Sequence, residues 1–113
     1  MGLKPATRTV DDTLAALADP QRRRIVELLG ARPHRAGELA AAVGVTAPAM
    51  SRHLRTLRES GLIVDSHPAF DARVRIYSLQ PAPMADLKRW LERTETMWAD
   101  QLAAFKAHVE GEA

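Results

Sequence analysis

The sequence predicts a mainly helical fold in which four helices precede a β-hairpin and one long helix follows it. Three observations predict this order. Helix-capping residues flank several stretches whose apolar residues recur every three or four positions. Two short stretches rich in Ile, Val and Tyr are separated by a proline-containing loop. After them, apolar residues keep a helical spacing from Met84 to about Val109.

The composition limits the class of protein. The chain has 113 residues, of which 46% are hydrophobic, so we expect one domain over 1–113 with a modest core. Residues 1–8 are expected to be disordered. Cysteine is absent, which excludes disulfides and thiolate chemistry within this sequence. No stretch has the pattern of a signal peptide or membrane span, so we expect a cytoplasmic protein that does not bind membranes.

The first two helices are predicted from their caps. Thr9 can cap a helix over residues 9–18, and two acidic residues follow it in the first turn. The predicted inward face of this helix consists of Val10, Leu14 and Leu17. Asp19 can cap a second helix over residues 20–29, which opens on proline and is expected to end at Gly30. Its predicted inward residues are Ile25, Leu28 and Leu29.

The next two helices are expected to be joined by a tight turn. A short helix is predicted over residues 36–42, with Gly44 as its stop signal. Thr46 can cap the following helix, which we expect over residues 47–60 with Gly61 at its end. Two short helices joined through a glycine turn are the helix-turn-helix arrangement.

The hairpin and the last helix complete the prediction. Strands are expected over residues 62–67 and 73–79, joined by a five-residue loop. Pro81 and Pro83 are expected to break the second strand before a helix over residues 84–109. The predicted fold is therefore a winged helix-turn-helix, mainly α with a β-hairpin wing.

The fourth helix has one apolar and one cationic face. At 100° per residue its apolar face consists of Met50, Leu54 and Leu57. The opposite face carries Pro48, Arg52, Arg55 and Glu59. Residues 20–58 hold eight arginines against two glutamates, whereas residues 84–113 hold four basic residues against six acidic ones. This asymmetry favours a polyanion as the partner of the first half of the chain.

Double-stranded DNA is the partner that fits the fourth helix. Small residues at its start allow close approach of the backbone, and Arg52 with Ser51 can reach base edges in the major groove. The hairpin can contact the backbone or the minor groove. The predicted DNA-contacting residues are Thr46, Ala47, Pro48, Ser51, Arg52, Arg55, Arg58, His67, Arg73 and Arg75. A solvated helix whose arginines serve solubility, and an edge strand protected by charge, are the alternatives.

Three stretches carry a family resemblance: LADPQRRRIVELL, AGELAAAVGVTAPAMSRHLRTLRESGLI and RVRIYSL. They resemble the ArsR-type winged helix repressors over Leu14–Leu102. The resemblance implies a homodimer held by the first and last helices on a two-fold symmetric operator. It implies base-reading positions at Thr46, Ala47, Pro48, Ser51 and Arg52, and a wing tip over 68–73.

The metal-sensing motifs of that family are missing. The family's thiolate motif would place cysteines at Ala40 and Ala42, and its last-helix site pairs an acidic residue with a histidine where this chain has Asp86 and Lys88. We therefore expect no metal and no cofactor, as in an autorepressor-like subgroup. Ser51 has no plausible base around it and no glycine-rich phosphate loop is present, so no enzyme is predicted.

A subunit interface is expected along the last helix. Its apolar stripe is too rich for a solvent-exposed helix, and its tryptophans suit interface anchors better than a ligand site. The predicted interface residues are Val10, Leu14, Leu17, Leu91, Trp98, Leu102 and Phe105. The leading hypothesis is a homodimeric, sequence-specific transcriptional repressor. A winged helix module that binds only protein, and a sensor of a small apolar ligand held between the long helices, are the alternatives.

Overall fold

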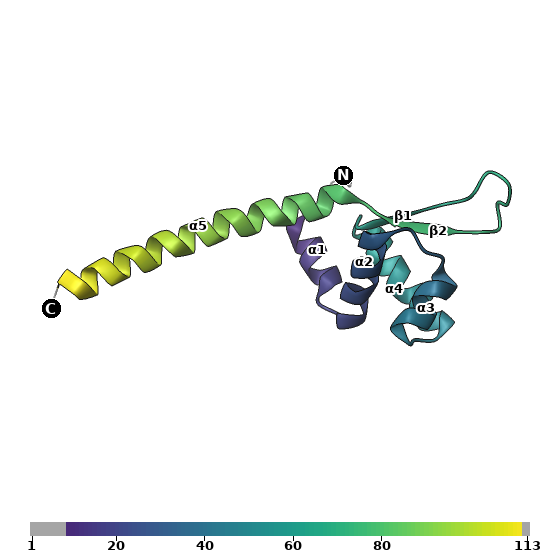
Figure 1. The fold of residues 1–113 in the computed structure, drawn as a ribbon, viewed down its shortest axis with the longest axis horizontal. Helices are drawn as coiled ribbons and strands as arrows, with labels where there is room; N and C mark the ends of the chain where they lie inside the picture. The colour runs from purple at the N-terminus through teal and green to yellow at the C-terminus, as the bar shows by residue number, and fades with distance from the viewer. Residues whose placement is uncertain (1–8, 112–113) are drawn as a thin grey trace, which may run out of the picture.

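The structure, a computed structural model, describes residues 9–111, and its elements follow the predicted order (Figure 1). Residues 1–8, which were expected to be disordered, lie outside the described residues. The elements are α1 (Val10–Leu17), α2 (Pro20–Ala31), α3 (Ala36–Val43), α4 (Ala47–Glu59), β1 (Ile63–Ser66), β2 (Ile76–Leu79) and α5 (Pro81–Gly111). The fold class predicted from the sequence is confirmed.

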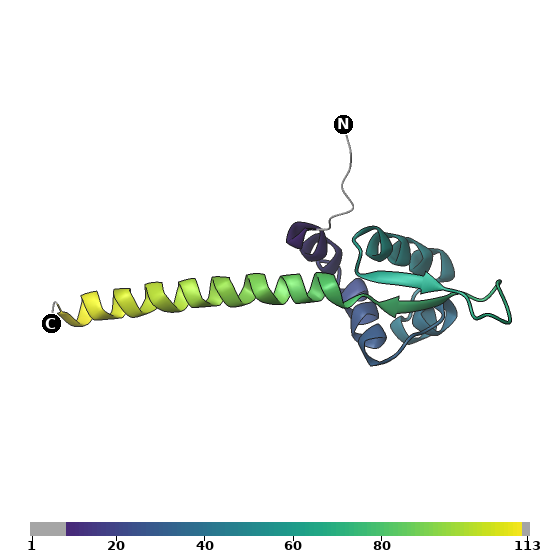
Figure 2. The same cartoon turned by 90° about the horizontal axis from the view of Figure 1, so that it is seen from above.

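The molecule consists of a body and one projecting helix. Helices α1 to α4 and the hairpin form the body, and α5 leaves it on one side while the hairpin loop extends on the other (Figure 1). The 31 residues of α5 span about 46 Å at the usual helical rise. Near its start α5 packs against α1, and β1 packs against α4 (Figure 2). Most of α5 therefore has no contact with the body.

The predicted caps begin three helices. The Thr9 hydroxyl accepts the backbone N–H of Asp12 at 3.1 Å, and the Asp12 carboxylate accepts the N–H of Thr9 at 3.2 Å. Asp19 accepts two backbone N–H groups at the start of α2. The Thr46 hydroxyl accepts the N–H of Ala49 at 3.2 Å and so begins α4. These bonds satisfy amide groups that have no partner within the helix.

Replacing Asp19 with Ala is expected to lower the free energy of unfolding by about 1 kcal/mol, since the cap of α2 is lost. Burial raises the pKa of Asp19, but the N–H donors of Arg22 and Gln21 outweigh it and hold that pKa below its ordinary value of 3.8. This stabilisation is present above pH 3.8 and lost at lower pH. Urea unfolding should therefore show a difference at pH 7 that shrinks as the pH falls below 4. Glu27→Ala, on the exposed face of α2, is the control and should change stability little.

Two helix ends were predicted correctly and one was not. Gly44 and Gly61 have φ of 82° and 84° and end α3 and α4 in the left-handed conformation. Gly30 was expected to end α2, but the helix continues through it to Ala31. Arg32 is extended instead (φ −171°, ψ 164°), because Pro33 disfavours a helical conformation in the residue before it.

The core joins α1 to α4 and the hairpin. Its buried hydrophobic residues are Ala16, Ile25, Val26, Leu29, Leu39, Met50, Leu54, Leu57, Leu62, Ile63 and Tyr77. The inward face of α1 was predicted only in part. Leu17 packs against the core, but Thr13 and Ala16 are the buried residues and Leu14 is 42% exposed. The Thr13 hydroxyl donates to the Thr9 carbonyl, which satisfies it inside the core.

The hairpin is shorter than predicted and its loop is longer. The ladder runs from Ile63↔Leu79 to Ser66↔Ile76, so the loop covers residues 67–75 rather than 68–72. Asp71 is the reason, because its backbone N–H donates to the Pro68 carbonyl and its carboxylate accepts the N–H of Arg73. These hydrogen bonds give the backbone N–H groups of Asp71 and Arg73 acceptors within the loop, so neither needs a partner on the opposite strand.

Two features of the chain around the hairpin were not predicted. His34, which lies between the helices predicted over residues 20–29 and 36–42, is buried and pairs through its backbone with Tyr77 on the outer side of β2. Pro81 and Pro83 were expected before the last helix, but α5 begins at Pro81 and Pro83 lies in its first turn. Proline is tolerated there because the first N–H groups of a helix have no helical acceptor.

Candidate nucleic-acid interface

The orientation of α4 is determined by its apolar face. Met50, Leu54 and Leu57 are each at most 3% exposed and pack into the core. At the turn before α4, the N–H groups of Gly44 and Val45 both donate to the carbonyl of Ala40. These two hydrogen bonds to one carbonyl oxygen hold a tight turn between α3 and α4. The cationic face of α4 consequently points away from the body.

All ten predicted DNA-contacting residues are exposed. On α4 and its cap these are Thr46, Ala47, Pro48, Ser51, Arg52, Arg55 and Arg58, and on the hairpin loop they are His67, Arg73 and Arg75. The helix and the hairpin lie beside each other, so both sets belong to one side of the body (Figure 2).

The arginines of this surface differ in their partners. Within residues 9–111, neither Arg52 nor Arg55 has a carboxylate at ion-pair distance. Arg58 and Arg75 instead share one carboxylate, that of Asp65, at 3.4 and 2.8 Å. On this surface, Arg52 and Arg55 are thus the arginines whose charges no carboxylate of residues 9–111 neutralises.

Two residues of the wing loop are ordered by local bonds. The Arg73 guanidinium and its backbone N–H donate to Asp71, which holds the pKa of that carboxyl below its ordinary value. The Arg73 side chain nevertheless stays 92% exposed. Nδ1 of His67 donates to the carbonyl of Val74 at 2.9 Å. The ring therefore closes the base of the loop.

The arginines of α2 have a structural role that the charge count did not reveal. Nε of Arg22 donates to the Ala16 carbonyl at 2.6 Å, and Nη1 of Arg23 donates to the Leu17 carbonyl at 2.8 Å. They satisfy carbonyls at the end of α1, which have no helical donors. The positive balance of residues 20–58 favours a polyanion as a partner, but two of its arginines instead hold α1 against α2.

His53 connects α4 to α2. The sequence places it at the edge of the apolar face, and its half-buried ring lies with Nε2 at 2.8 Å from the amide oxygen of Gln21. This bond joins the helix that presents Arg52 to the helix that Asp19 caps. The position of α4 is therefore supported by a polar contact as well as by its apolar face.

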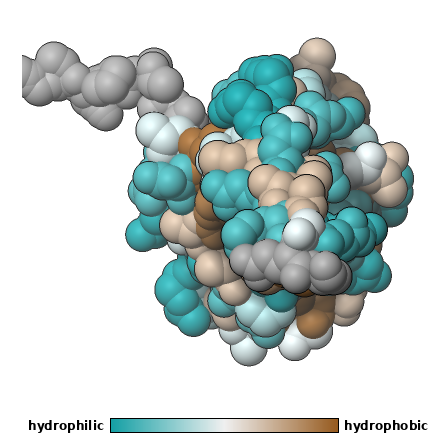
Figure 3. All heavy atoms as spheres, turned by 90° about the vertical axis from the view of Figure 1, so that its left-hand side faces the viewer, coloured by the Kyte–Doolittle hydropathy of each residue, from teal (hydrophilic) through white to brown (hydrophobic). Residues whose placement is uncertain are grey.

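The apolar stripe of α5 runs from the body outward. Leu87 is 8% exposed and belongs to the body, whereas Trp98, Leu102 and Phe105 are 60 to 66% exposed further along the same stripe. Figure 3 looks along α5 from its C-terminal end and shows apolar surface interleaved with hydrophilic surface on this side. Within 9–111 nothing covers these side chains.

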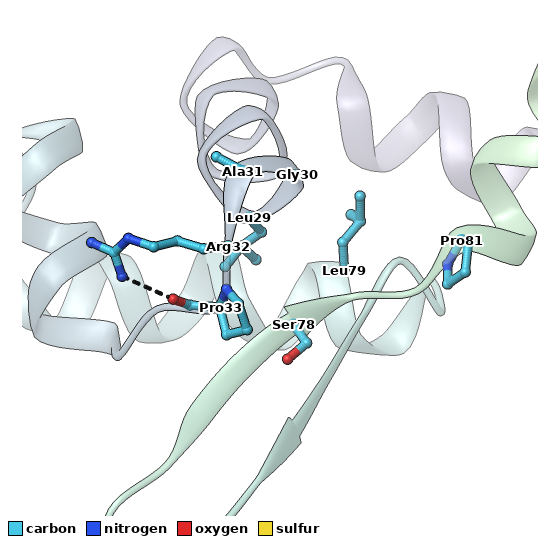
Figure 4. A pocket seen from close by; sticks show the side chains of 8 residues that line it. All are labelled: Leu29, Gly30, Ala31, Arg32, Pro33, Ser78, Leu79 and Pro81. Carbon is cyan, nitrogen blue, oxygen red and sulfur yellow. Dashed lines mark hydrogen bonds between the residues drawn. The ribbon is translucent and has the colours of Figure 1, made fainter.

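An open hollow of about 380 Å³ lies where α2, β2 and α5 meet (Figure 4). Leu29, Leu79 and Pro81 give it an apolar wall. The one charged residue of its lining, Arg32, extends away from Leu79 and bonds to the carbonyl of Pro33. The sensor hypothesis placed a small apolar ligand between the long helices, and this hollow lies elsewhere. In Figure 4 no charged side chain of the lining points into it.

The described part of the chain holds no group of three His, Asp or Glu side chains that could bind a metal ion. No helix in residues 9–111 is both long and apolar enough to cross a membrane.

A winged helix-turn-helix with a cationic, outward-facing second helix defines the class of DNA-binding transcription regulators. Residues 19–64 match the family described as "Bacterial regulatory protein, arsR family". The chain is 38% identical over 105 residues to the HTH-type transcriptional regulator Rv2034 of Mycobacterium tuberculosis, covering 93% of this chain and 92% of that one. It is 28% identical to the transcriptional repressor SdpR of Bacillus subtilis, covering 73% and 88%.

The solved structures agree. An ArsR-like transcriptional regulator from Rhodococcus sp. RHA1 is 31% identical, with a TM-score of 0.72 over 86% of this chain and 89% of that one. The chain belongs to the ArsR family of bacterial regulatory proteins, as the resemblance had implied. Members of this class are transcription factors, so the prediction that the chain is not an enzyme is confirmed.

Proposed function

We propose that the protein is a homodimeric, sequence-specific repressor that inserts α4 into the major groove and places the wing on the backbone or in the minor groove. The observation that carries this proposal is the cationic face of α4, where Arg52 and Arg55 are exposed and have no ion-pair partner within residues 9–111. Repression would follow from occlusion of promoter DNA. A relative of this chain is named as a transcriptional repressor, which supports that outcome.

The dimer is proposed from the exposed stripe of α5. Leu91, Trp98, Leu102 and Phe105 are each at least half exposed, an amount of apolar surface that monomeric proteins rarely leave open. A second copy is the occupant that we propose, with 84–109 as the dimerisation helix. Helix α1 packs against α5, and we include Val10, Leu14 and Leu17 of α1 in the proposed interface; Leu14 is exposed, and the other two are half-buried.

The dimer would present two copies of α4 to one duplex. Recognition helices of a two-fold symmetric dimer reach successive major grooves about 34 Å apart. The exposed side chains of Thr46, Ala47, Pro48, Ser51 and Arg52 would then face base edges, while Arg55, Arg58, His67, Arg73 and Arg75 would face the backbone or the minor groove. These assignments follow from the outward position of each residue.

Selection of bound sites from random DNA tests this proposal. We expect an enriched sequence with two-fold symmetry whose half-sites lie one helical turn apart. A protein-interaction module would enrich no sequence and would not bind duplex DNA at low salt. Failure to enrich any site at 50 mM salt would therefore overturn the proposed function.

A further inference from the structure

A second hollow, of about 200 Å³, lies between α4 and the hairpin. Its lining combines cationic, hydroxyl and aromatic side chains from the two elements that are proposed to contact DNA. The lining residues are Ser51, Leu54, Arg55, Arg58, Arg75 and Tyr77. The hollow therefore opens on the same side of the body as the recognition helix.

One carboxylate organises the cations at this hollow. Asp65 lies in β1, opposite Tyr77 in the ladder, and its side chain is 19% exposed. Oδ2 accepts from Nη1 of Arg75 at 2.8 Å, and Oδ1 lies 3.4 Å from Nη1 of Arg58. Asp65 thus joins the last turns of α4 to the residue that leads into β2. Both arginines remain about half exposed, so each keeps donors that can reach another anion.

The charges around the hollow favour an anion. Arg55, Arg58 and Arg75 contribute three positive charges, and Asp65 neutralises one of them. A phosphodiester carries a single negative charge and oxygens that accept from guanidinium N–H groups. The hydroxyl of Ser51 is a further donor in the lining.

We propose that this hollow seats one phosphate of the DNA backbone in each half-site, and that Asp65 is the residue that positions Arg58 and Arg75 to hold it. The inference rests on the DNA-binding function proposed above. Two flexible side chains lose less conformational freedom on binding when a carboxylate already holds them in place. The negative charge of Asp65 by itself repels DNA, so its two effects on affinity have opposite signs.

The opposite signs provide the test. Asp65→Asn removes the negative charge and weakens the hydrogen bonds that position Arg58 and Arg75. Glu59→Gln, at the C-terminal end of α4, removes a negative charge near the same surface and leaves those hydrogen bonds intact. Glu59 is exposed and has no ion-pair partner among residues 9–111. If charge alone matters, both variants bind the selected operator more tightly. We expect Glu59→Gln to bind more tightly and Asp65→Asn to bind about tenfold more weakly.

The salt dependence gives a second readout that general destabilisation would not change. Loss of one phosphate contact per protomer should make the slope of log K against log salt concentration shallower by about one for each protomer in Asp65→Asn. Glu59→Gln should keep the wild-type slope. Circular dichroism at the assay temperature checks that both variants are folded.

Neutral methylphosphonate linkages then locate the phosphate. In the selected operator, one position per half-site should weaken binding of the wild type but not of Arg75→Ala. The inference is overturned if Asp65→Asn binds as tightly as Glu59→Gln, or if no position shows this dependence on Arg75. If the wild-type protein binds the operator but the variants do not behave as expected, only the inference about the phosphate is overturned. If the wild-type protein binds no DNA, the proposed function is overturned as well.

Discussion

Replacing Leu102 with glutamate is expected to convert the proposed dimer into a monomer and to lower operator affinity by at least about a hundredfold. Leu102 lies on the exposed stripe of α5, and the proposed interface would bury its side chain against the second copy. A carboxylate there would be desolvated without a partner, which costs several kcal/mol per ion. A dimer binds one operator with two linked copies of α4, and this linkage raises its affinity above that of a single copy. A monomer loses that gain in affinity.

The matched control is Ala107→Glu. Ala107 is also exposed on α5, but at 100° per residue it lies on the side of the helix away from Leu102. It should leave the mass and the affinity unchanged. Sedimentation at micromolar concentration measures the mass, and fluorescence anisotropy with the operator measures the affinity. A Leu102→Glu protein that stays dimeric would contradict the interface proposed on α5.

Replacing Arg52 with alanine is expected to cost about 1–3 kcal/mol of binding free energy in each half-site and to relax the preference at one base position. Arg52 is exposed near the middle of α4, and no carboxylate within 9–111 competes for its guanidinium. A guanidinium with free donors can bond to both O6 and N7 of guanine, and the shortened side chain leaves those acceptors unpaired.

The control for this variant is Arg24→Ala, which removes the same charge from the exposed side of α2. Arg24 pairs with Glu27 on the surface, so its loss should change affinity little. Binding is measured on the operator and on duplexes with single base changes. A loss for Arg52→Ala that is equal on all sequences would place Arg52 on a phosphate and contradict base reading.

These experiments distinguish two parts of the cationic surface. Arg52 and Arg55 have no protein carboxylate nearby in the described residues, whereas Arg58 and Arg75 are held by Asp65. Of the first pair, Arg52 is the residue proposed to contact base edges, a contact that differs from site to site, whereas Arg55 lines the hollow beside Arg58. The second suits a backbone contact whose position does not depend on sequence.

The amino-acid sequence by itself determined the features that arise within one or two helical turns. Thr46 as a cap, Gly44 and Gly61 as left-handed ends, and the buried face of α4 were all predicted correctly. Such signals are local, because a cap bonds to an amide three residues away and an amphipathic face follows from the helical repeat alone. The exposure of every predicted DNA-contacting residue follows from that face and from the hairpin loop.

The tertiary structure alone decided which polar groups meet. Arg22 satisfies carbonyls six and seven residues before it, His53 reaches Gln21 across two helices, and Asp65 gathers arginines from two elements. It also placed Thr13 rather than Leu14 in the core and lengthened the hairpin loop. An arginine has the same charge and helical preference at every one of these positions. Its role therefore depends on which acceptor the folded chain brings within about 3 Å of its guanidinium. Packing between segments far apart in the sequence sets that distance.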